Sequence, residues 1–223
     1  MKKEEFKIYV FRHGQTYYNK NKIFTGWKNP KLTPLGLKQA KIVAKKLKNK
    51  KIGAAFYTRL SRSKDTLREV LKNHPECKLK IKDDRMIERS YGILEGTSHD
   101  SFINNMGKQE YKLEVQGDAI ENLNKEDRKK VEKFLGSKEY EAIHRGYNVA
   151  VPGGESFADI EKRVQSFITY LVKFIKKYRV NVIISAHGNS IRLFRKIMER
   201  ASKQKAVNWI IPYDKYFEYS IRV

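Results

Sequence analysis

The sequence predicts a three-layer α/β/α sandwich with a mostly parallel sheet, and three observations support this fold class. Short apolar segments typical of buried strands alternate with longer amphipathic segments typical of helices. Two of the strand-like segments end in histidine followed by glycine, at His13 and His187. The chain has 223 residues, which fits one domain with a full core. We therefore expect a single domain over residues 1–223, with a helical cap inserted at about 97–151.

The first third of the chain is expected to alternate strands and helices. The apolar segment Lys7–Phe11 predicts a buried strand. Thr33 and Pro34 mark the start of a helix, because threonine suits the N-cap and proline suits the first helical position. The apolar residues that repeat there at helical spacing are Leu37, Ala40, Val43, Ala44 and Leu47. A strand, a helix and a third strand are predicted at Ala54–Tyr57, Leu60–Leu71 and Leu79–Ile81.

The middle of the chain has a different composition. Residues from about Thr97 to Val151 are rich in Lys, Glu, Asn and Gln and contain few β-branched runs. Two short helices are predicted within this region, at Lys125–Phe134 and Lys138–Ile143. We interpret the region as an insertion or cap, not as a separate domain.

The last third returns to the α/β pattern. Glu155 and Ser156 begin a long amphipathic helix after a proline-glycine turn. The apolar stripe of this helix consists of Phe157, Ile160, Val164, Phe167, Leu171 and Phe174. A buried strand at Asn181–Ser185 and a further helix follow. Two final strands are predicted at Val207–Ile211 and Tyr216–Val223.

The composition indicates which partners and which compartment to expect. The formal net charge of +23 favours encounters with anions. The lysines are spread over many expected helices and no nucleic-acid-binding motif is present, so we expect small phosphorylated metabolites as partners and not nucleic acid. No apolar segment approaches the ~20 residues that span a bilayer, and no signal-peptide core follows Met1. With Cys77 as the single cysteine, we expect a cytoplasmic enzyme. The sequence leaves open whether the protein forms a homo-oligomer.

The two strand-end histidines suggest one assembled site. Loops at the carboxyl ends of strands line the ligand crevice of an open α/β sheet. A neutral imidazole at His13 is a nucleophile, and guanidinium groups nearby keep the ring neutral. Arg12 and Arg62 would orient a phosphoryl group, and His187 would add a donor. Because guanidinium groups would balance the phosphoryl charge, we expect no metal.

Transfer of a phosphoryl group to His13 requires an acid for the leaving oxygen. Glu88 is the best candidate, since a partly buried carboxyl beside bound phosphate favours its protonated form and can donate that proton. The alternative is a structural salt bridge from Glu88 to Arg85 or Arg89, which sequence spacing alone favours.

These residues together resemble a known family. In chain order they are Arg12-His13-Gly14, Arg62, Glu88 and His187-Gly188. The set resembles the histidine phosphatase superfamily, and more closely its cofactor-dependent phosphoglycerate mutase branch. The resemblance implies that His13 is the phosphorylated residue and that Glu88 is the acid and base. It also implies that Arg12, Arg62 and His187 form the phosphate pocket.

The resemblance to the mutase branch extends to substrate-binding positions. Phe24-Thr25-Gly26-Trp27 is similar to the mutase segment whose backbone holds a substrate carboxylate. The positions that the resemblance assigns to phosphate or substrate are Asn19, Thr25, Gly26, Arg89, Tyr91, His99, His144, Arg145, Gly188 and Asn189. The implied reaction is the glycolytic interconversion of 3-phosphoglycerate and 2-phosphoglycerate, with 2,3-bisphosphoglycerate as the priming phosphodonor.

Three departures from the mutase pattern keep other functions open. Ile23 and His99 stand where the mutases carry an arginine and a lysine, and His144 replaces one of two paired arginines. Segments such as Leu94-Glu95-Gly96 resemble the broad-specificity phosphatases instead. The first alternative is therefore a histidine phosphatase that hydrolyses small phosphate monoesters. The second is a catalytically idle member that binds a polyanion or a protein through its basic surface.

Overall fold

A five-stranded sheet forms the centre of the molecule. The computed structural model describes residues 4–114 and 123–223. The strands follow the order β3-β2-β4-β1-β5 across the sheet. Their bounds are β1 Glu5–Arg12, β2 Ala54–Tyr57, β3 Leu79–Lys82, β4 Val182–Ala186 and β5 Tyr216–Arg222. All neighbouring strands are parallel except β5, which pairs antiparallel with β1. The predicted α/β fold with a mostly parallel sheet is confirmed.

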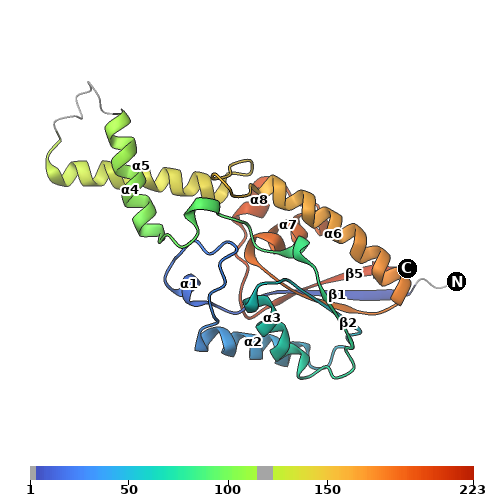
Figure 1. Cartoon of the computed structure of the whole chain (residues 1–223). Coiled ribbons are helices and arrows are strands. Elements are labelled where there is room, and N and C mark those ends of the chain that lie inside the picture. The colour runs from blue at the N-terminus through green and yellow to red at the C-terminus, as the bar shows by residue number, and fades with distance from the viewer. Residues whose placement is uncertain (1–3, 115–122) are drawn as a thin grey trace.

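Two pairs of helices cover the two faces of the sheet (Figure 1). They are α2 Pro34–Leu47 with α3 Ser61–Leu71, and α6 Phe157–Tyr178 with α7 Gly188–Met198. Alternation along β1 supplies both cores, because successive strand side chains point to opposite faces. Ile8 and Val10 join the core that includes α6 and α7, whereas Tyr9 and Phe11 join the core under α2 and α3.

The predicted helix starts are confirmed at their capping residues. The Thr33 hydroxyl accepts a hydrogen bond of 3.0 Å from the backbone N–H of Gly36, and Pro34 is the first residue of α2. Ser156 caps α6 in a reciprocal capping box with Asp159. The remaining short elements are α1 Tyr17–Lys20, α8 Lys203–Asn208 and 3₁₀ turns at Asp84–Met86 and Gly92–Leu94.

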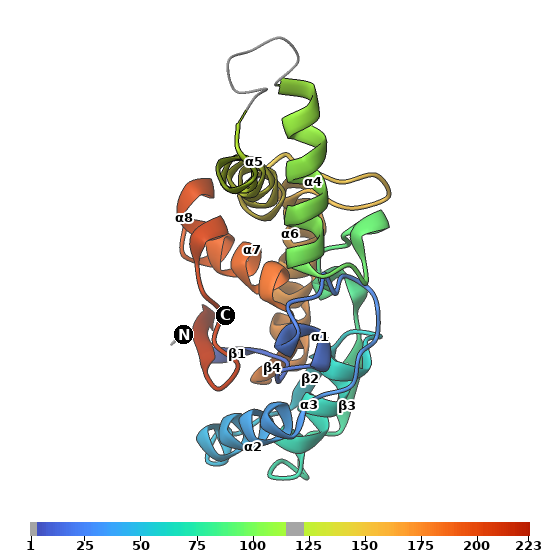
Figure 2. The same cartoon turned by 90° about the vertical axis from the view of Figure 1, so that its left-hand side faces the viewer.

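Two long helices reach outward from the rest of the chain (Figures 1 and 2). They are α4 His99–Glu114 and α5 Lys125–Arg145. The two short helices predicted at 125–134 and 138–143 are therefore one continuous helix. Gly136 lies within this helix and does not interrupt it. The glycine allows α4 and α5 to pack closely, because a Cβ there would lie 1.9 Å from the carbonyl oxygen of Ile103 on α4. The division of the chain into one domain with an inserted cap stays a prediction.

The strand predicted at Val207–Ile211 is wrong. Residues up to Asn208 form the end of α8, and no strand is assigned between there and β5. The carbonyl groups of Val207, Trp209 and Ile211 accept hydrogen bonds from arginine side chains instead of from a neighbouring strand. None of the helices in the described part of the chain has the length and apolarity that a membrane crossing requires.

Candidate active site

Three adjacent parallel strands end at the same place. His13 directly follows β1, Thr58 follows β2, and His187 follows β4. Because β2, β4 and β1 are neighbours in the sheet, their carboxyl ends bring these side chains together. The rings of His13 and His187 have centroids 5.1 Å apart. The two histidines predicted to share a site therefore do so.

His13 presents a free ring nitrogen. Its Nδ1–H donates a hydrogen bond of 2.7 Å to the carbonyl of Gly14, which fixes the tautomer and leaves the lone pair on Nε2. The side chain is almost fully buried. Burial holds the pKa of His13 well below its ordinary value, and the positive charges of Arg62 and Arg12 lower it further. At neutral pH, Nε2 is therefore an uncharged nucleophile.

His187 is held by a buried hydroxyl. Its Nε2 lies 2.8 Å from the Thr58 hydroxyl, and its buried Nδ1 has no partner among the described residues. Burial holds the pKa of His187 well below its ordinary value, and the positive charge of Arg62 lowers it further. Sequence reasoning did not find Thr58. The available signal was its position immediately after a predicted strand.

Arg62 is a fully buried cation at the start of α3. Its two terminal nitrogens donate hydrogen bonds of 2.7 Å to the carbonyls of Lys28 and Gly26. Gly26 has a φ of +47°, so the carbonyl that receives Arg62 depends on a backbone conformation that favours glycine. Burial lowers the pKa of Arg62 to about 10, so it stays charged at neutral pH. Its Nε is buried and has no partner within the described ranges.

Arg12 approaches from the end of β1. One terminal nitrogen donates a hydrogen bond of 3.1 Å to the carbonyl of Ile211, and the guanidinium lies 4.0 Å from the ring centre of Tyr213. Its Nε is also buried and lacks a partner in the described part of the chain. Two guanidinium groups with unpaired donors suit an anion. Sequence reasoning did not find Tyr213.

Glu88 faces the two histidines. Its Oε1 accepts hydrogen bonds from the backbone N–H groups of Arg89, at 2.8 Å, and Asn189, at 3.1 Å. Ligand atoms of Glu88, His13 and His187 all lie within 4.8 Å of one another. This spacing is close to what a metal ion needs, but the guanidinium groups beside it repel a cation and favour an anion.

Among the described residues, Glu88 forms no salt bridge with Arg85 or Arg89, so the structural alternative is not observed. Arg85 pairs with Asp83. Arg89 is buried and donates hydrogen bonds to three backbone carbonyls, which belong to Glu155, Ile143 and Val149. Arg89 therefore ties the backbone around the site together and does not line the cavity described next.

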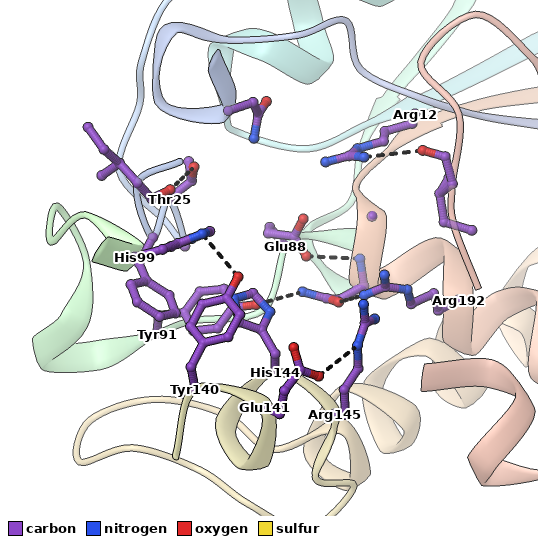
Figure 3. A pocket seen from close by; sticks show the side chains of 17 residues that line it. Arg12, Thr25, Glu88, Tyr91, His99, Tyr140, Glu141, His144, Arg145 and Arg192 are labelled. Carbon is purple, nitrogen blue, oxygen red and sulfur yellow. Dashed lines mark hydrogen bonds and ion pairs between the residues drawn. The ribbon is translucent and has the colours of Figure 1, made fainter. Parts of the chain in front are cut away.

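A cavity of about 260 Å³ adjoins this cluster (Figure 3). The predicted site residues that line it are Arg12, Asn19, Thr25, Gly26, Glu88, Tyr91, His99, His144, Arg145, Gly188 and Asn189. His13, Arg62 and His187 are not part of the lining but are buried beside Arg12 and Glu88. The lining also contains Tyr140, Glu141 and Arg192, which sequence reasoning missed. Arg192 was detectable, since it lies one helical turn after Gly188.

The two sides of the cavity differ in charge. Arg12, Arg145 and Arg192 lie on one side, and rings from Tyr91, His99, Tyr140 and His144 lie on the other (Figure 3). Burial lowers the pKa of Arg192 to about 10, which leaves it charged at neutral pH.

Comparison with known proteins identifies the family. The model of the histidine phosphatase superfamily (branch 1) matches residues 8–133 and 113–216. The chain is 34% identical over 189 residues to a phosphoglycerate mutase of Schizosaccharomyces pombe, covering 83% of this chain and 75% of the relative. It is 30% identical over 206 residues to a 2,3-bisphosphoglycerate-dependent phosphoglycerate mutase of Methanococcus vannielii, covering 92% and 86%. The chain belongs to the histidine phosphatase superfamily and is an enzyme of the phosphoglycerate mutase or related phosphatase type.

Solved structures share the fold. A phosphoglycerate mutase from Bacillus anthracis aligns with a TM-score of 0.68 at 18% identity, over 98% of this chain and 89% of the other. A protein described as a putative alpha-ribazole-5'-P phosphatase from Escherichia coli aligns with a TM-score of 0.70 at 17% identity, over 96% and 89%. Mutases and phosphatases thus share this architecture, and the fold does not choose between them.

Proposed function

We propose that this enzyme transfers phosphoryl groups through a phosphohistidine at His13. Nε2 of His13 attacks phosphorus, the ester P–O bond breaks, and Glu88 gives its proton to the leaving oxygen. The unpaired Nε donors of Arg12 and Arg62 balance the charge on the phosphoryl oxygens. The observation that carries this proposal is the neutral, unbonded Nε2 of His13 beside the guanidinium groups of the fully buried Arg62 and the partly buried Arg12.

We infer further that the main reaction is the interconversion of 3-phosphoglycerate and 2-phosphoglycerate in the cytoplasm. Relatives at 30% identity or above carry mutase names. Arg145 and Arg192 add positive charge beyond the phosphoryl cluster, which suits a substrate with a second anionic group. In the priming step, 2,3-bisphosphoglycerate would supply the phosphoryl group, and Arg12 and Arg62 would hold it.

Hydrolysis of phosphate monoesters is the second candidate, and His99 and His144 favour it. Both rings line the cavity where a mutase-like site would need fixed cations to retain a bisphosphorylated intermediate. Burial lowers the pKa of both side chains, so neither is charged at neutral pH. We therefore expect mutase activity accompanied by measurable release of inorganic phosphate.

Product analysis separates these reactions. The enzyme is incubated with 3-phosphoglycerate, with and without 2,3-bisphosphoglycerate, and the products are resolved by NMR. Formation of 2-phosphoglycerate that depends on the bisphosphate supports the mutase. Release of phosphate from many monoesters without any 2-phosphoglycerate would exclude it and leave the phosphatase.

The phosphohistidine itself is tested by labelling. Brief incubation with a ³²P-labelled phosphodonor should give an adduct that is stable in base and labile in acid. The His13→Ala variant should give none, because the proposal assigns the attack on phosphorus to Nε2 of His13, whereas Nε2 of His187 is already hydrogen-bonded to the Thr58 hydroxyl. A normal adduct in that variant would show that His13 is not the nucleophile.

A further inference from the structure

Five rings form the side of the cavity that faces the arginines. They belong to Phe24, Tyr91, His99, Tyr140 and His144, and we call this set the aromatic wall. Phe24 stacks on His144 with ring centres 5.4 Å apart and planes at 21°. Tyr140 lies 4.2 Å from His144 between ring centres, and its hydroxyl shares a hydrogen bond of 3.0 Å with Nδ1 of His99. The wall is therefore a packed unit whose members fix one another.

The aromatic wall carries no charge at neutral pH. Burial lowers the pKa of His144 to about 3, with smaller contributions from His99 and Arg145. Burial also lowers the pKa of His99. Glu141, in the cavity lining next to the wall, pairs with Arg145 at 3.7 Å, so it adds no positive charge to this side. A second phosphate or carboxylate would find no cation on this side.

One buried polar atom of the aromatic wall lacks a hydrogen-bond partner in the described part of the chain. Nε2 of His144 is buried and has no partner among residues 4–114 and 123–223. A neutral imidazole nitrogen is either a donor or an acceptor, depending on the tautomer, and a hydroxyl group can serve both. Such a group satisfies a buried nitrogen that otherwise costs free energy. The ring faces around it suit the C–H bonds on one face of an uncharged ring.

We propose that, besides the phosphoglycerate interconversion proposed above, the cavity binds and hydrolyses phosphate monoesters of an uncharged, hydroxyl-bearing ring, that is, sugar phosphates. The phosphate lies at His13, and the sugar ring lies against the aromatic wall with a hydroxyl on Nε2 of His144. This inference rests on the proposed phosphohistidine chemistry. After the sugar leaves as an alcohol, water attacks phosphorus, the N–P bond breaks, and Glu88 accepts the proton of water.

Three substrates test the proposal on the wild-type enzyme. Glucose 6-phosphate has the uncharged hydroxyl-bearing ring, cyclohexylmethyl phosphate has a ring without hydroxyls, and 3-phosphoglycerate has a carboxylate. Release of phosphate is measured for each. We expect kcat/KM for phosphate release from glucose 6-phosphate to exceed the values for the other two substrates by about tenfold or more. The reason is that a site built to bind a hydroxyl group rejects ligands that lack it.

Variants at His144 test the assignment of the aromatic wall. His144→Arg should reverse the order of kcat/KM for glucose 6-phosphate and 3-phosphoglycerate, because it places a fixed cation there. His144→Gln keeps an uncharged hydrogen-bonding group and should retain the wild-type order. Asn148→Arg is the matched control, because it adds the same charge at an exposed position outside the cavity lining. Thermal unfolding shows whether each variant folds.

The outcomes distinguish this inference from the proposed function. Labelling of His13 by nitrophenyl phosphate reports the phosphohistidine chemistry alone. If the adduct forms but the wild-type enzyme releases phosphate from 3-phosphoglycerate as fast as from glucose 6-phosphate, the sugar-phosphate assignment is wrong and the chemistry stands. If no donor gives an adduct, both are wrong. The wild-type comparison decides the matter even if no His144 variant folds.

Discussion

The buried imidazoles at the site link catalysis to folding. His13, His144 and His187 all have pKa values below the ordinary histidine value, in each case mainly because burial disfavours the charged ring. A neutral ring at His13 is what nucleophilic attack needs. The same neutrality means that the folded protein binds fewer protons than the unfolded chain once the pH falls below about 6.5.

We therefore predict that stability falls as the pH is lowered from 7 to 5.5. In this range the unfolded chain gains protons that the folded protein does not, so the free energy of unfolding decreases by up to about 1.4 kcal/mol per pH unit for each such histidine. Urea unfolding at several pH values measures the slope. His144→Gln removes one of these groups and should make the slope shallower. An identical slope in the variant would contradict the assignment.

Glu88 has a geometry suited to proton transfer. Two backbone N–H groups hold Oε1, while Oε2 has no protein partner among the described residues. We expect Glu88→Gln to lower kcat by ~10²–10⁴-fold, the usual contribution of a general acid. Nitrophenyl phosphate has a good leaving group that needs little protonation, so the decrease in kcat with this substrate should be smaller. Steady-state kinetics with both substrates test this, and equal losses would indicate a positioning role for Glu88.

At the scale of elements, the crossing of α4 and α5 positions half of the cavity. His99 begins α4 and His144 lies in the last turn of α5, so the packing of these helices sets the aromatic wall. The helices meet backbone to backbone at two glycines. A Cβ on Gly107 would lie 1.9 Å from the carbonyl oxygen of Glu132, and Gly136 makes the equivalent approach to Ile103.

Gly136→Ala should destabilise the protein although alanine is the better helix former. The gain in helix propensity is ~1 kcal/mol. The added methyl group meets a backbone atom that cannot move alone, and overpacking of this kind costs about 1–3 kcal/mol. Urea unfolding measures the difference. Lys138→Ala changes an exposed residue of the same helix and serves as the control. Greater stability in the Gly136 variant would disprove the close contact.

The sequence predicted those elements whose determining residues are close together along the chain. Alternation in β1, the Thr33 cap and the two His-Gly strand ends were all readable along the chain. The segment Val207–Ile211 was not, because its carbonyls bind arginines from distant elements: Arg145, Arg192 and Arg12. Its apolar, β-branched sequence is typical of a strand, but the contacts that fix its structure lie elsewhere in the sequence. Thr58 and Arg192 were missed although each had a local signal: Thr58 directly follows a predicted strand, and Arg192 lies one helical turn after Gly188.

At the scale of the whole molecule, the charge of +23 has two parts. A small part lies in the cavity lining, at Arg12, Arg145 and Arg192. Hydrogen bonds to backbone carbonyls hold these side chains in place. The larger part consists of exposed lysines, such as Lys38, Lys41 and Lys45 on α2. This distribution raises the local concentration of small phosphorylated anions. It favours an enzyme that attracts its substrates by charge over a protein built to bind nucleic acid.

Nucleic acid should therefore bind only weakly. Contacts between lysines and phosphates give affinity that depends on the release of counterions, so it falls steeply as salt rises. We expect fluorescence anisotropy with a labelled DNA duplex to give a Kd weaker than about 1 μM at physiological salt, and moderate added salt to abolish binding. An unlabelled duplex should leave phosphate release unchanged, because a polymer does not fit a cavity of about 260 Å³. Binding tighter than this that survives physiological salt would show that the basic surface has a polyanion partner of its own.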